Sequence, residues 1–387
     1  MSEDWLPGVL SRDQVLWLSR DGYIEGIENE DAVDQSAVDL HITDSAWKLT
    51  EGSVKPSGDR YLTQIKKDYL VDPLELRDGR FLLRKRTTYL FKIRERLHLQ
   101  QLNRNLYGQA TAKSSVGRVD VLARLIVDGM LDYETFTPEQ VQKGSGEMYV
   151  EVTPITFDVC VRPGAALTQL RFFLGAPEAS EIRDVELYKT CLAGTDKPNG
   201  TLSVDLTPVD IGGLAVSAFA TSIREARDPI LLGESDVKPQ PWLYWRCLQL
   251  GSTSRLRIAK DQFYILRSKE RIALPAGVAV YCRANDETIG EMRIHYAGFV
   301  HPLFGLTRKD GSRGTPLIFE VRGHDVNVSL RDGERMARLT FYRMSRDATP
   351  GASAYEGQTL QLSKFFAPWP RQLKNVEGDG VVEPENP

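Results

Sequence analysis

The sequence lacks the motifs that mark several common classes of enzyme. Its 387 residues include five histidines and four widely spaced cysteines, and no pair of cysteines has the spacing of a metal site. The His-x-Glu and Pro-Cys-x-x-Cys signature of the zinc nucleobase deaminases is absent, and so is His-Glu-x-x-His. Neither Gly-x-Gly-x-x-Gly nor a Walker loop occurs, which argues against a Rossmann or P-loop fold.

Long apolar runs and a strong charge of one sign are also missing. No run of about eighteen apolar residues occurs, so we expect no membrane span. The N-terminus has neither the basic region nor the apolar core of a secretory signal, so we expect a cytoplasmic protein with reduced thiols. The net charge of -4 gives no general affinity for nucleic acid, so any phosphate site must be local.

Short apolar stretches bounded by turn residues fill most of the chain, and they are rich in Val, Ile, Leu, Tyr and Phe, as strands are. The clearest cover residues 36–42, 80–83, 88–93, 147–152 and 157–161. A short helix is predicted over residues 11–20, where Ser11 can cap its start. Strands of this length and spacing predict an all-β fold, a barrel or sandwich with a few short helices.

The order of these stretches repeats about 170 residues further along the chain. Glu151 lies eleven residues before Arg162-Pro-Gly164, and Glu320 lies eleven residues before Arg331-Asp-Gly333. Both acids lie in apolar strand patterns, and both turns lead into another strand. This agreement indicates an internal duplication.

The duplication predicts two units joined by a short exposed connection. We expect the first unit over residues 1–194 and the second over residues 195–375, because the segment from Gly194 to Gly200 reads as a turn. Residues 376–387 are acidic and rich in Gly and Pro, so we expect them to form a disordered tail.

Residues Lys113-Ser-Ser-Val-Gly-Arg118, which we call the cradle, form a candidate phosphate site. Lys and Arg donate charge-assisted hydrogen bonds to phosphate oxygens, and small hydroxyl residues on a tight turn leave backbone N–H groups open to the same ligand. Taken alone, the segment also fits a polar turn at the start of a short helix, with Arg118 paired to Asp120.

Glu151 is a candidate acid–base residue for the same site. Strand alternation puts Glu151 and Tyr149 on one face, and a catalytic role needs that face in a pocket, where burial raises the pKa of the carboxyl group toward the working pH. A solvent-facing acid on an amphipathic strand fits the same pattern. Asp132 is either a second acid of this site or an ordinary turn residue.

Taken in chain order, these segments resemble the metal-free dCTP deaminases of the dUTPase-like superfamily over nearly the whole chain. The matching segments are an N-terminal helix at residues 10–22, the strand Ser36-Ala-Val-Asp-Leu40, an Arg-Ser-Ser-x-x-Arg motif at residues 113–118 with Lys in place of the first Arg, the strand Met148-Tyr-Val-Glu151, and a C-terminal lid from Tyr355 through Gln358 to Lys364. Family members are normally half as long, so the chain is similar to a fused tandem form. The resemblance implies two tandem dUTPase-like distorted β-barrels.

The resemblance also implies an activity, the metal-independent hydrolysis of dCTP to dUTP and ammonia. Glu151 would carry protons from water to the pyrimidine ring nitrogen and then to the leaving ammonia, while Ser114 and Arg118 would position the water and the acid. Lys113 and Ser115 would contact phosphates. Mg²⁺ would arrive bound to the triphosphate and would not activate the water.

The second unit departs from the family pattern. Residues 286–291 stand where its cradle is expected, and their acids would repel a triphosphate. In another family segment Phe299 and His301 replace a conserved Arg and Asp, and the first unit has Met130 where that Arg is expected. The resemblance therefore implies that the first unit supplies Ser114, Arg118 and Glu151, and that the second supplies walls and a lid. The residues expected in those walls and lid are Ala297, Phe299, His301, Glu320, Tyr355, Gln358 and Lys364.

Two other functions fit the sequence. In a dUTP diphosphatase, alone or joined to deamination, Asp132 would activate a water at the α-phosphate, as a similar Gly-x-x-Asp does in the sister family. A decayed site would instead leave a non-catalytic nucleotide-binding β-barrel protein. Candidate ligands besides dCTP are dUTP and dTTP, and the resemblance implies a homo-oligomer, specifically a trimer.

Overall fold

The computed structural model describes residues 5–99, 102, 105–141, 144–196, 198–222, 228–250, 255–284, 292–295, 298–306, 313–349, 358–378 and 380–385. Strands dominate these ranges, and their α-helices are short: α1 (Arg12–Arg20), α2 (Tyr61–Lys67), α3 (Ser114–Gly117), α4 (Pro138–Val141) and α5 (Val185–Cys191). No helix within the described ranges has the length and apolar character needed to cross a membrane.

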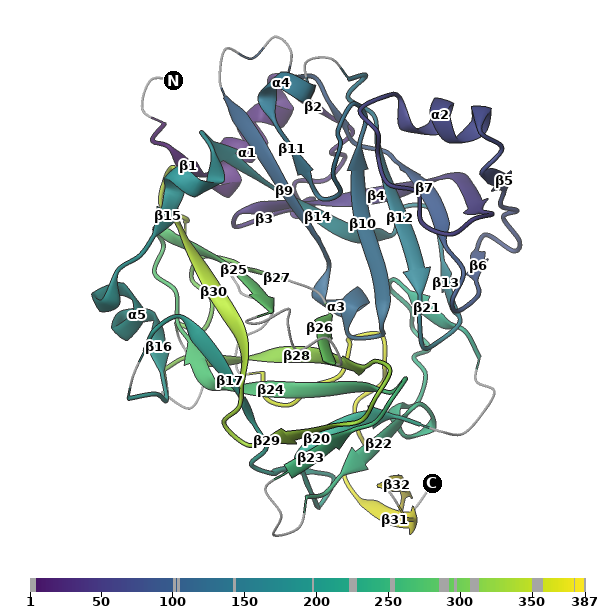
Figure 1. Cartoon of the computed structure of the whole chain (residues 1–387), viewed down its shortest axis with the longest axis vertical. Helices are drawn as coiled ribbons and strands as arrows, with labels where there is room; N and C mark the ends of the chain where they lie inside the picture. The colour runs from purple at the N-terminus through teal and green to yellow at the C-terminus, as the bar shows by residue number, and fades with distance from the viewer. Residues whose placement is uncertain are drawn as a thin grey trace.

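The first unit is built on a ten-stranded sheet, at the top of Figure 1. Its main path runs β10 (Val121–Val127), β12 (Met148–Pro154), β7 (Tyr89–Ile93), β4 (Ala37–Leu49), β14 (Ala166–Leu174), β9 (Leu106–Ala112) and β11 (Thr135–Phe136). Three short strands pair off this path: β1 (Gly8–Val9), β3 (Val33–Asp34) and β5 (Val71–Pro73).

The second unit is built on an eleven-stranded sheet in the lower part of Figure 1. Its main path runs β22 (Trp245–Leu248), β20 (Ala218–Thr221), β24 (Phe263–Ile272), β17 (Thr201–Asp205), β30 (Arg335–Arg343), β25 (Val278–Ala284) and β27 (Gly298–Val300). Off this path lie β15 (Glu181–Ile182), β16 (Leu192–Ala193), β26 (Met292–His295) and β28 (Thr315–Gly323).

Smaller sheets complete the fold. β13 (Val159–Val161) pairs with β6 (Phe81–Leu83) of the first unit and, in parallel, with β21 (Ile230–Leu232) of the second, so one sheet spans both units. The remaining pairs are β2 (Ile24–Glu25) with β8 (Arg96–Leu97), β18 (Val209–Ile211) with β19 (Leu214–Val216), β23 (Arg255–Ile258) with β29 (Val328–Arg331), and β31 (Leu373–Glu377) with β32 (Val381–Pro384).

The predicted all-β fold is confirmed, with a nearly closed barrel and a half-barrel. The predicted helix at residues 11–20 is α1, and Gln14 Oε1 accepts a hydrogen bond from the backbone N–H of Ser11 at 2.9 Å, which is one half of a capping box. The five strand predictions correspond to β4, β6, β7, β12 and β13. β4 is much longer than predicted because it pairs on both edges, with β14 and with β7.

The strand pairings show the duplication at single-residue register. β12 lies between β10 and β7, so that Glu151 pairs with Arg124 and with Leu90. In the same way β28 lies between β26 and β24, and Glu320 pairs with residues 295 and 265. Glu151 and Glu320 therefore occupy equivalent positions in the two units.

Two expectations about boundaries need correction. β15 and β16 pair with β30 and β24, so residues 181–193 pack with the second sheet, although the predicted boundary at 194 places them in the first unit. The prediction of a disordered tail from residue 376 is wrong for residues 376–378 and 380–385. There β31 and β32 form a hairpin, because Val381 and Val382 are buried and Cys247 donates its backbone N–H to the Gly380 carbonyl oxygen at 2.8 Å.

The two units share a hydrophobic core as well as a sheet. One continuous cluster joins first-unit residues such as Phe91 and Phe172 to second-unit residues such as Trp245 and Phe263. Because this buried surface holds the units together, residues contributed by different units can keep fixed positions relative to one another.

Candidate functional site

A cavity of about 610 Å³ lies between the two units. The first unit lines it with the start of α1, β3 and the loop after it, Asp39 of β4, Gln169 of β14, and residues 112–114 and 118. The second unit lines it with parts of β25, β27 and β28 and with residues 301, 304, 349, 358 and 364. Figure 1 shows α3, the helix of the cradle, at the junction of the two sheets, facing β26 and β28.

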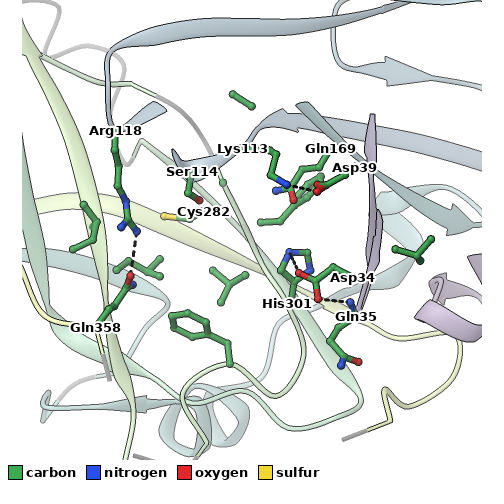
Figure 2. A pocket seen from close by; sticks show the side chains of 18 of the residues that line it. Asp34, Gln35, Asp39, Lys113, Ser114, Arg118, Gln169, Cys282, His301 and Gln358 are labelled. Atoms are coloured by element: carbon green, nitrogen blue, oxygen red, sulfur yellow. Dashed lines mark hydrogen bonds and ion pairs between the residues drawn. The ribbon is translucent and has the colours of Figure 1, made fainter. Parts of the chain in front are cut away.

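The cradle is a single helical turn between two strands. β9 ends at Ala112 and β10 begins at Val121, and between them the Lys113 carbonyl oxygen accepts the backbone N–H groups of Val116 at 2.8 Å and Gly117 at 3.0 Å. This turn brings Lys113, Ser114 and Arg118 to the cavity wall (Figure 2). Three residues of the predicted site therefore lie together.

Ser115, the fourth cradle residue of the predicted site, does not line the cavity. It is buried, and its carbonyl oxygen accepts the hydroxyl hydrogen of Ser363 at 2.7 Å. The prediction that Ser115 contacts phosphate therefore finds no support in this geometry. A helical turn points successive side chains in directions about 100° apart, so adjacent serines cannot both face one wall.

Two lysines contribute positive charge to the cavity. Lys113 Nζ forms an ion pair with Asp39, and Lys364 lines the same cavity. Burial and the neighbouring positive charge of Lys113 lower the pKa of Lys364. Two ammonium groups that repel each other are both stabilised by an anion placed near them. This part of the cavity fits a phosphate group.

Glu320 of β28 is a carboxylic acid close to Arg118 of the cradle. It is 6% exposed and lines the cavity. Burial raises the pKa of Glu320 to about 8, against the opposing positive charge of Arg118, and the charge of Asp120 raises it further. A carboxyl group with this pKa can both accept and donate a proton near neutral pH.

The C-terminal segment holds the guanidinium group of the cradle. Arg118 Nη2 donates to Gln358 Oε1 at 3.1 Å, and Gln358 Nε2 donates to the Pro316 carbonyl oxygen at 2.9 Å (Figure 2). Gln358 and Lys364, two of the residues expected in the lid, therefore line the cavity. Two other predicted residues, Ala297 and Tyr355, lie outside the described residues.

An ion pair that the sequence did not reveal joins the cradle region to β28. Arg322 follows Glu320 by two residues on β28, and it forms a buried ion pair with Asp120, which follows Arg118 by two residues. Arg322 Nη1 also donates to the Asp261 carbonyl oxygen at 2.9 Å. The signal in the sequence was a basic and an acidic residue two positions apart in each segment. The basic residue comes first in one segment, Arg118 and Asp120, and the acidic residue comes first in the other, Glu320 and Arg322. The ion pair holds β28 in place, with Glu320 opposite Arg118.

The structure corrects the assignment of Glu151 as the acid beside Ser114 and Arg118. Glu151 is 1% exposed and is not among the residues that line the cavity. Its carboxylate forms an ion pair with Arg124 and accepts hydrogen bonds from Tyr133 Oη and Ser53 Oγ at 3.0 Å each, and from the backbone N–H of Val54 at 3.2 Å. The strand pattern is the same in both units, so it could not tell which acid the cradle would face.

Asp132 also lies away from the cavity. It forms an ion pair with Lys55 at 2.8 Å, and both side chains are about two-thirds exposed, at 67% and 66%. The alternative that Asp132 is a turn residue agrees with this position. An exposed carboxylate with a lysine partner has no geometry for activating water in the cavity described above.

Phe299 and His301, two of the residues expected in the walls of the site, line the cavity. Phe299 lies over the guanidinium group of Arg171, with 4.0 Å from Cζ to the ring centroid. His301 Nε2 lies 3.6 Å from Asp34 Oδ2 (Figure 2), and His301 Nδ1 lies 2.9 Å from Ser36 Oγ. The sequence did not single out Arg171 or Asp34, because nothing local connects either residue with His301.

Within the described ranges, no group of three or more His, Cys, Asp or Glu side chains is arranged to hold a metal ion. The expected Mg²⁺ would arrive with a triphosphate, so it stays a prediction.

The fold and the cavity define a broad class of protein. Two halves of a duplicated β fold close around a buried carboxyl group whose pKa is raised to about 8, and lysines in the same cavity favour a negatively charged ligand. These are the properties of an enzyme that performs acid–base chemistry on an anionic substrate.

Comparisons with known proteins specify the family. The model of the 2′-deoxycytidine 5′-triphosphate deaminase (DCD) N-terminal domain matches residues 6–176, and that of the C-terminal domain matches residues 201–366. The crystal structure of 2′-deoxycytidine 5′-triphosphate deaminase from Agrobacterium tumefaciens is similar, with 26% sequence identity and a TM-score of 0.76, over 88% of this chain and 97% of that chain. No curated protein matches the chain.

The chain belongs to the 2′-deoxycytidine 5′-triphosphate deaminase family. The resemblance stated from the sequence is thereby confirmed, and a nucleotide is its class of substrate.

Proposed function

We propose that the chain hydrolyses dCTP to dUTP and ammonia, with Glu320 as the group that carries protons. The observation that carries this proposal is the position of Glu320, buried opposite Arg118 in a cavity that both units line, with a pKa raised to about 8. Membership of the deaminase family supports the substrate and the reaction.

The residues can take complementary roles in the deamination. A water molecule adds to C4 of the cytosine ring, and Glu320 accepts a proton from this water and gives it to the ring nitrogen N3. A second proton moves through Glu320 to the amino group, the C4–N bond breaks, and ammonia leaves. Ser114 and Arg118 donate hydrogen bonds to the oxygen atoms on which negative charge develops.

The triphosphate is bound by the lysines. Lys113 and Lys364 line the cavity, and the ion pair of Lys113 with Asp39 competes with phosphate for the ammonium group. Mg²⁺ enters with the triphosphate and offsets part of its charge, so we expect removal of Mg²⁺ to raise KM more than it lowers kcat.

We also infer a homo-oligomer, specifically a trimer, in the cytoplasm. The support for the oligomer is the family resemblance of the sequence, and the support for the compartment is that all four cysteines are free. A mass measurement by light scattering on the purified chain tests the trimer, and a monomeric mass at micromolar concentration overturns it.

Product analysis tests the reaction directly. The chain is incubated with dCTP and Mg²⁺, with and without chelator, while ammonia and nucleotides are measured. We expect equal amounts of ammonia and dUTP. Release of pyrophosphate and dUMP would show the diphosphatase instead, and binding of dCTP without any product would show a non-catalytic nucleotide-binding protein. The diphosphatase is not favoured, because its candidate residue Asp132 lies away from the cavity.

A further inference from the structure

A guanidinium group is buried behind the cavity wall. Arg171 of β14 has no exposed surface, and within the described ranges no carboxylate forms an ion pair with it. Its Nη1 donates to the Val280 carbonyl oxygen at 3.1 Å, its Nη2 donates to Ser36 Oγ at 3.1 Å, and Phe299 covers its face. Burying a cation costs free energy unless hydrogen bonds and nearby charges compensate for it. The contacts of Arg171 are therefore a place to look for a function.

The contact with Ser36 determines where the serine hydrogen points. Arg171 can only donate, so Ser36 Oγ must accept from it. Ser36 itself is fully buried, and among the described residues its other partner is His301 Nδ1 at 2.9 Å. The single hydroxyl hydrogen of Ser36 therefore donates to Nδ1, because otherwise it would be buried without an acceptor. Nδ1 then carries no hydrogen, and the hydrogen of the neutral imidazole ring lies on Nε2.

The Nε2 side of the ring is open to the cavity. Asp34 Oδ2 lies 3.6 Å from Nε2, which is too far for a good hydrogen bond, and Asp34 Oδ1 accepts the backbone N–H of Gln35 at 2.7 Å (Figure 2). Nε2–H is therefore available to a ligand in the cavity that His301 lines.

The surrounding charges favour the neutral ring. Burial and the charges of Arg171 and Lys113 lower the pKa of His301, against the opposing effects of Asp34 and Asp39. These four groups come from β14, the cradle, β3 and β4, so elements far apart in the sequence set the charge around the ring.

We propose that Ser36 and Arg171 are positioning residues that hold His301 as the neutral Nε2–H tautomer, so that it donates a hydrogen bond to the nucleotide in the cavity. The nature of the ligand rests on the proposed function, whereas the tautomer does not. His301 stands where the resemblance leads one to expect an acid, so this donor replaces an acceptor at the same place in the cavity wall.

Nitrogen-15 NMR of histidine-labelled protein tests the tautomer without substrate or turnover. The chain has five histidines, and His301→Gln identifies the signal of His301. We expect the Nε2–H pattern at pH 7 in the unaltered chain and a mixture of tautomers in Ser36→Ala. A protonated ring or an Nδ1–H pattern in the unaltered chain overturns the proposal, and so does an unchanged pattern in Ser36→Ala. Because this measurement needs no deamination, it separates failure of the tautomer from failure of the proposed function.

Kinetics test the hydrogen bond to the nucleotide. We expect Ser36→Ala to raise KM for dCTP about twofold while kcat is unchanged, because only part of the ring population then presents Nε2–H to the ligand. Ser180→Ala is the matched control, since Ser180 is equally buried in the 3-10 helix Pro177–Ser180 and does not line the cavity. His301→Gln keeps an N–H donor and should bind dCTP more tightly than His301→Leu. Equal KM values for these two variants would overturn the donor role.

Discussion

Glu151 and Glu320 hold equivalent places in the two units, yet their surroundings differ completely. Glu151 is covered by residues 53 and 54 of its own unit and is paired with Arg124. Glu320 faces a cavity, and within the described ranges no side chain forms an ion pair with its carboxyl group. The comparison teaches that the strand position alone does not make an acid catalytic. What covers the strand decides whether the carboxyl group is a structural anion or a proton carrier.

The largest expected effect separates the two acids. We expect Glu320→Gln to lower kcat for dCTP deamination about a thousandfold, because the amide cannot exchange protons. Glu151→Gln should leave kcat within about threefold while lowering the free energy of unfolding by about 1–2 kcal/mol, because Arg124 loses its charged partner but is partly exposed to water. Ammonia release and chemical denaturation of both variants measure these effects. A loss of kcat in Glu151→Gln as large as that in Glu320→Gln would contradict the comparison.

The ion pair of Arg322 with Asp120 sharpens the comparison, since the first unit has Thr153 in the place equivalent to Arg322. We expect Arg322→Met to lower the free energy of unfolding by about 3 kcal/mol, because it leaves the buried Asp120 carboxylate without its charged partner, although the Thr156 hydroxyl still donates to it. Urea denaturation measures this loss. The matched control is Arg20→Met, which removes an exposed ion pair with Glu30 and should leave the denaturation midpoint unchanged. Equal midpoints for the two variants would show that the buried pair contributes nothing.

The pH dependence of kcat/KM below about pH 8 should follow the protonation of Glu320. Its pKa is raised to about 8, so at lower pH the carboxyl group is protonated and cannot accept a proton from water. We therefore expect kcat/KM to rise with pH up to about pH 8 and then to level off. The same profile should persist in Glu151→Gln. A kcat/KM that is constant between about pH 6 and pH 8, the range below that pKa, would show that Glu320 does not accept the proton.

The smallest effect is expected at Asp132. Its ion pair with Lys55 is exposed and lies beside the segment that covers Glu151, outside the cavity. We expect Asp132→Asn to change kcat for dCTP by less than about twofold, because exposed ion pairs contribute little. Lys55→Gln serves as its control, since it breaks the same pair from the other side. Release of pyrophosphate from dUTP that disappears in Asp132→Asn would instead support the diphosphatase.

Local patterns were enough to predict much of the fold. The strand at residues 147–152, the helix at residues 11–20 and the duplication all follow from the periodicity of apolar residues and from the spacing of turns. The cradle residues Lys113, Ser114 and Arg118 were found because their chemistry lies within six consecutive positions. These features depend on neighbours in the sequence.

What the sequence did not reveal depends on distant segments. The choice between Glu320 and Glu151 rests on which strand packs against the cradle and on the cover that residues 53 and 54 place over Glu151. The burial of Arg171 rests on the second unit, because Phe299 and the Val280 carbonyl oxygen surround it. The terminal hairpin was missed for the same reason, since Val382 is buried in the shared core although its own segment is polar. Composition cannot report contacts of this kind.

The cradle and its acid belong to opposite halves of one polypeptide, and the equivalent acid of the first half is already covered. Titration with a dCTP analogue that cannot be deaminated should therefore saturate at one nucleotide per polypeptide, although the fold contains two copies of the unit. The covered Glu151 therefore cannot replace Glu320 in a polypeptide that loses it.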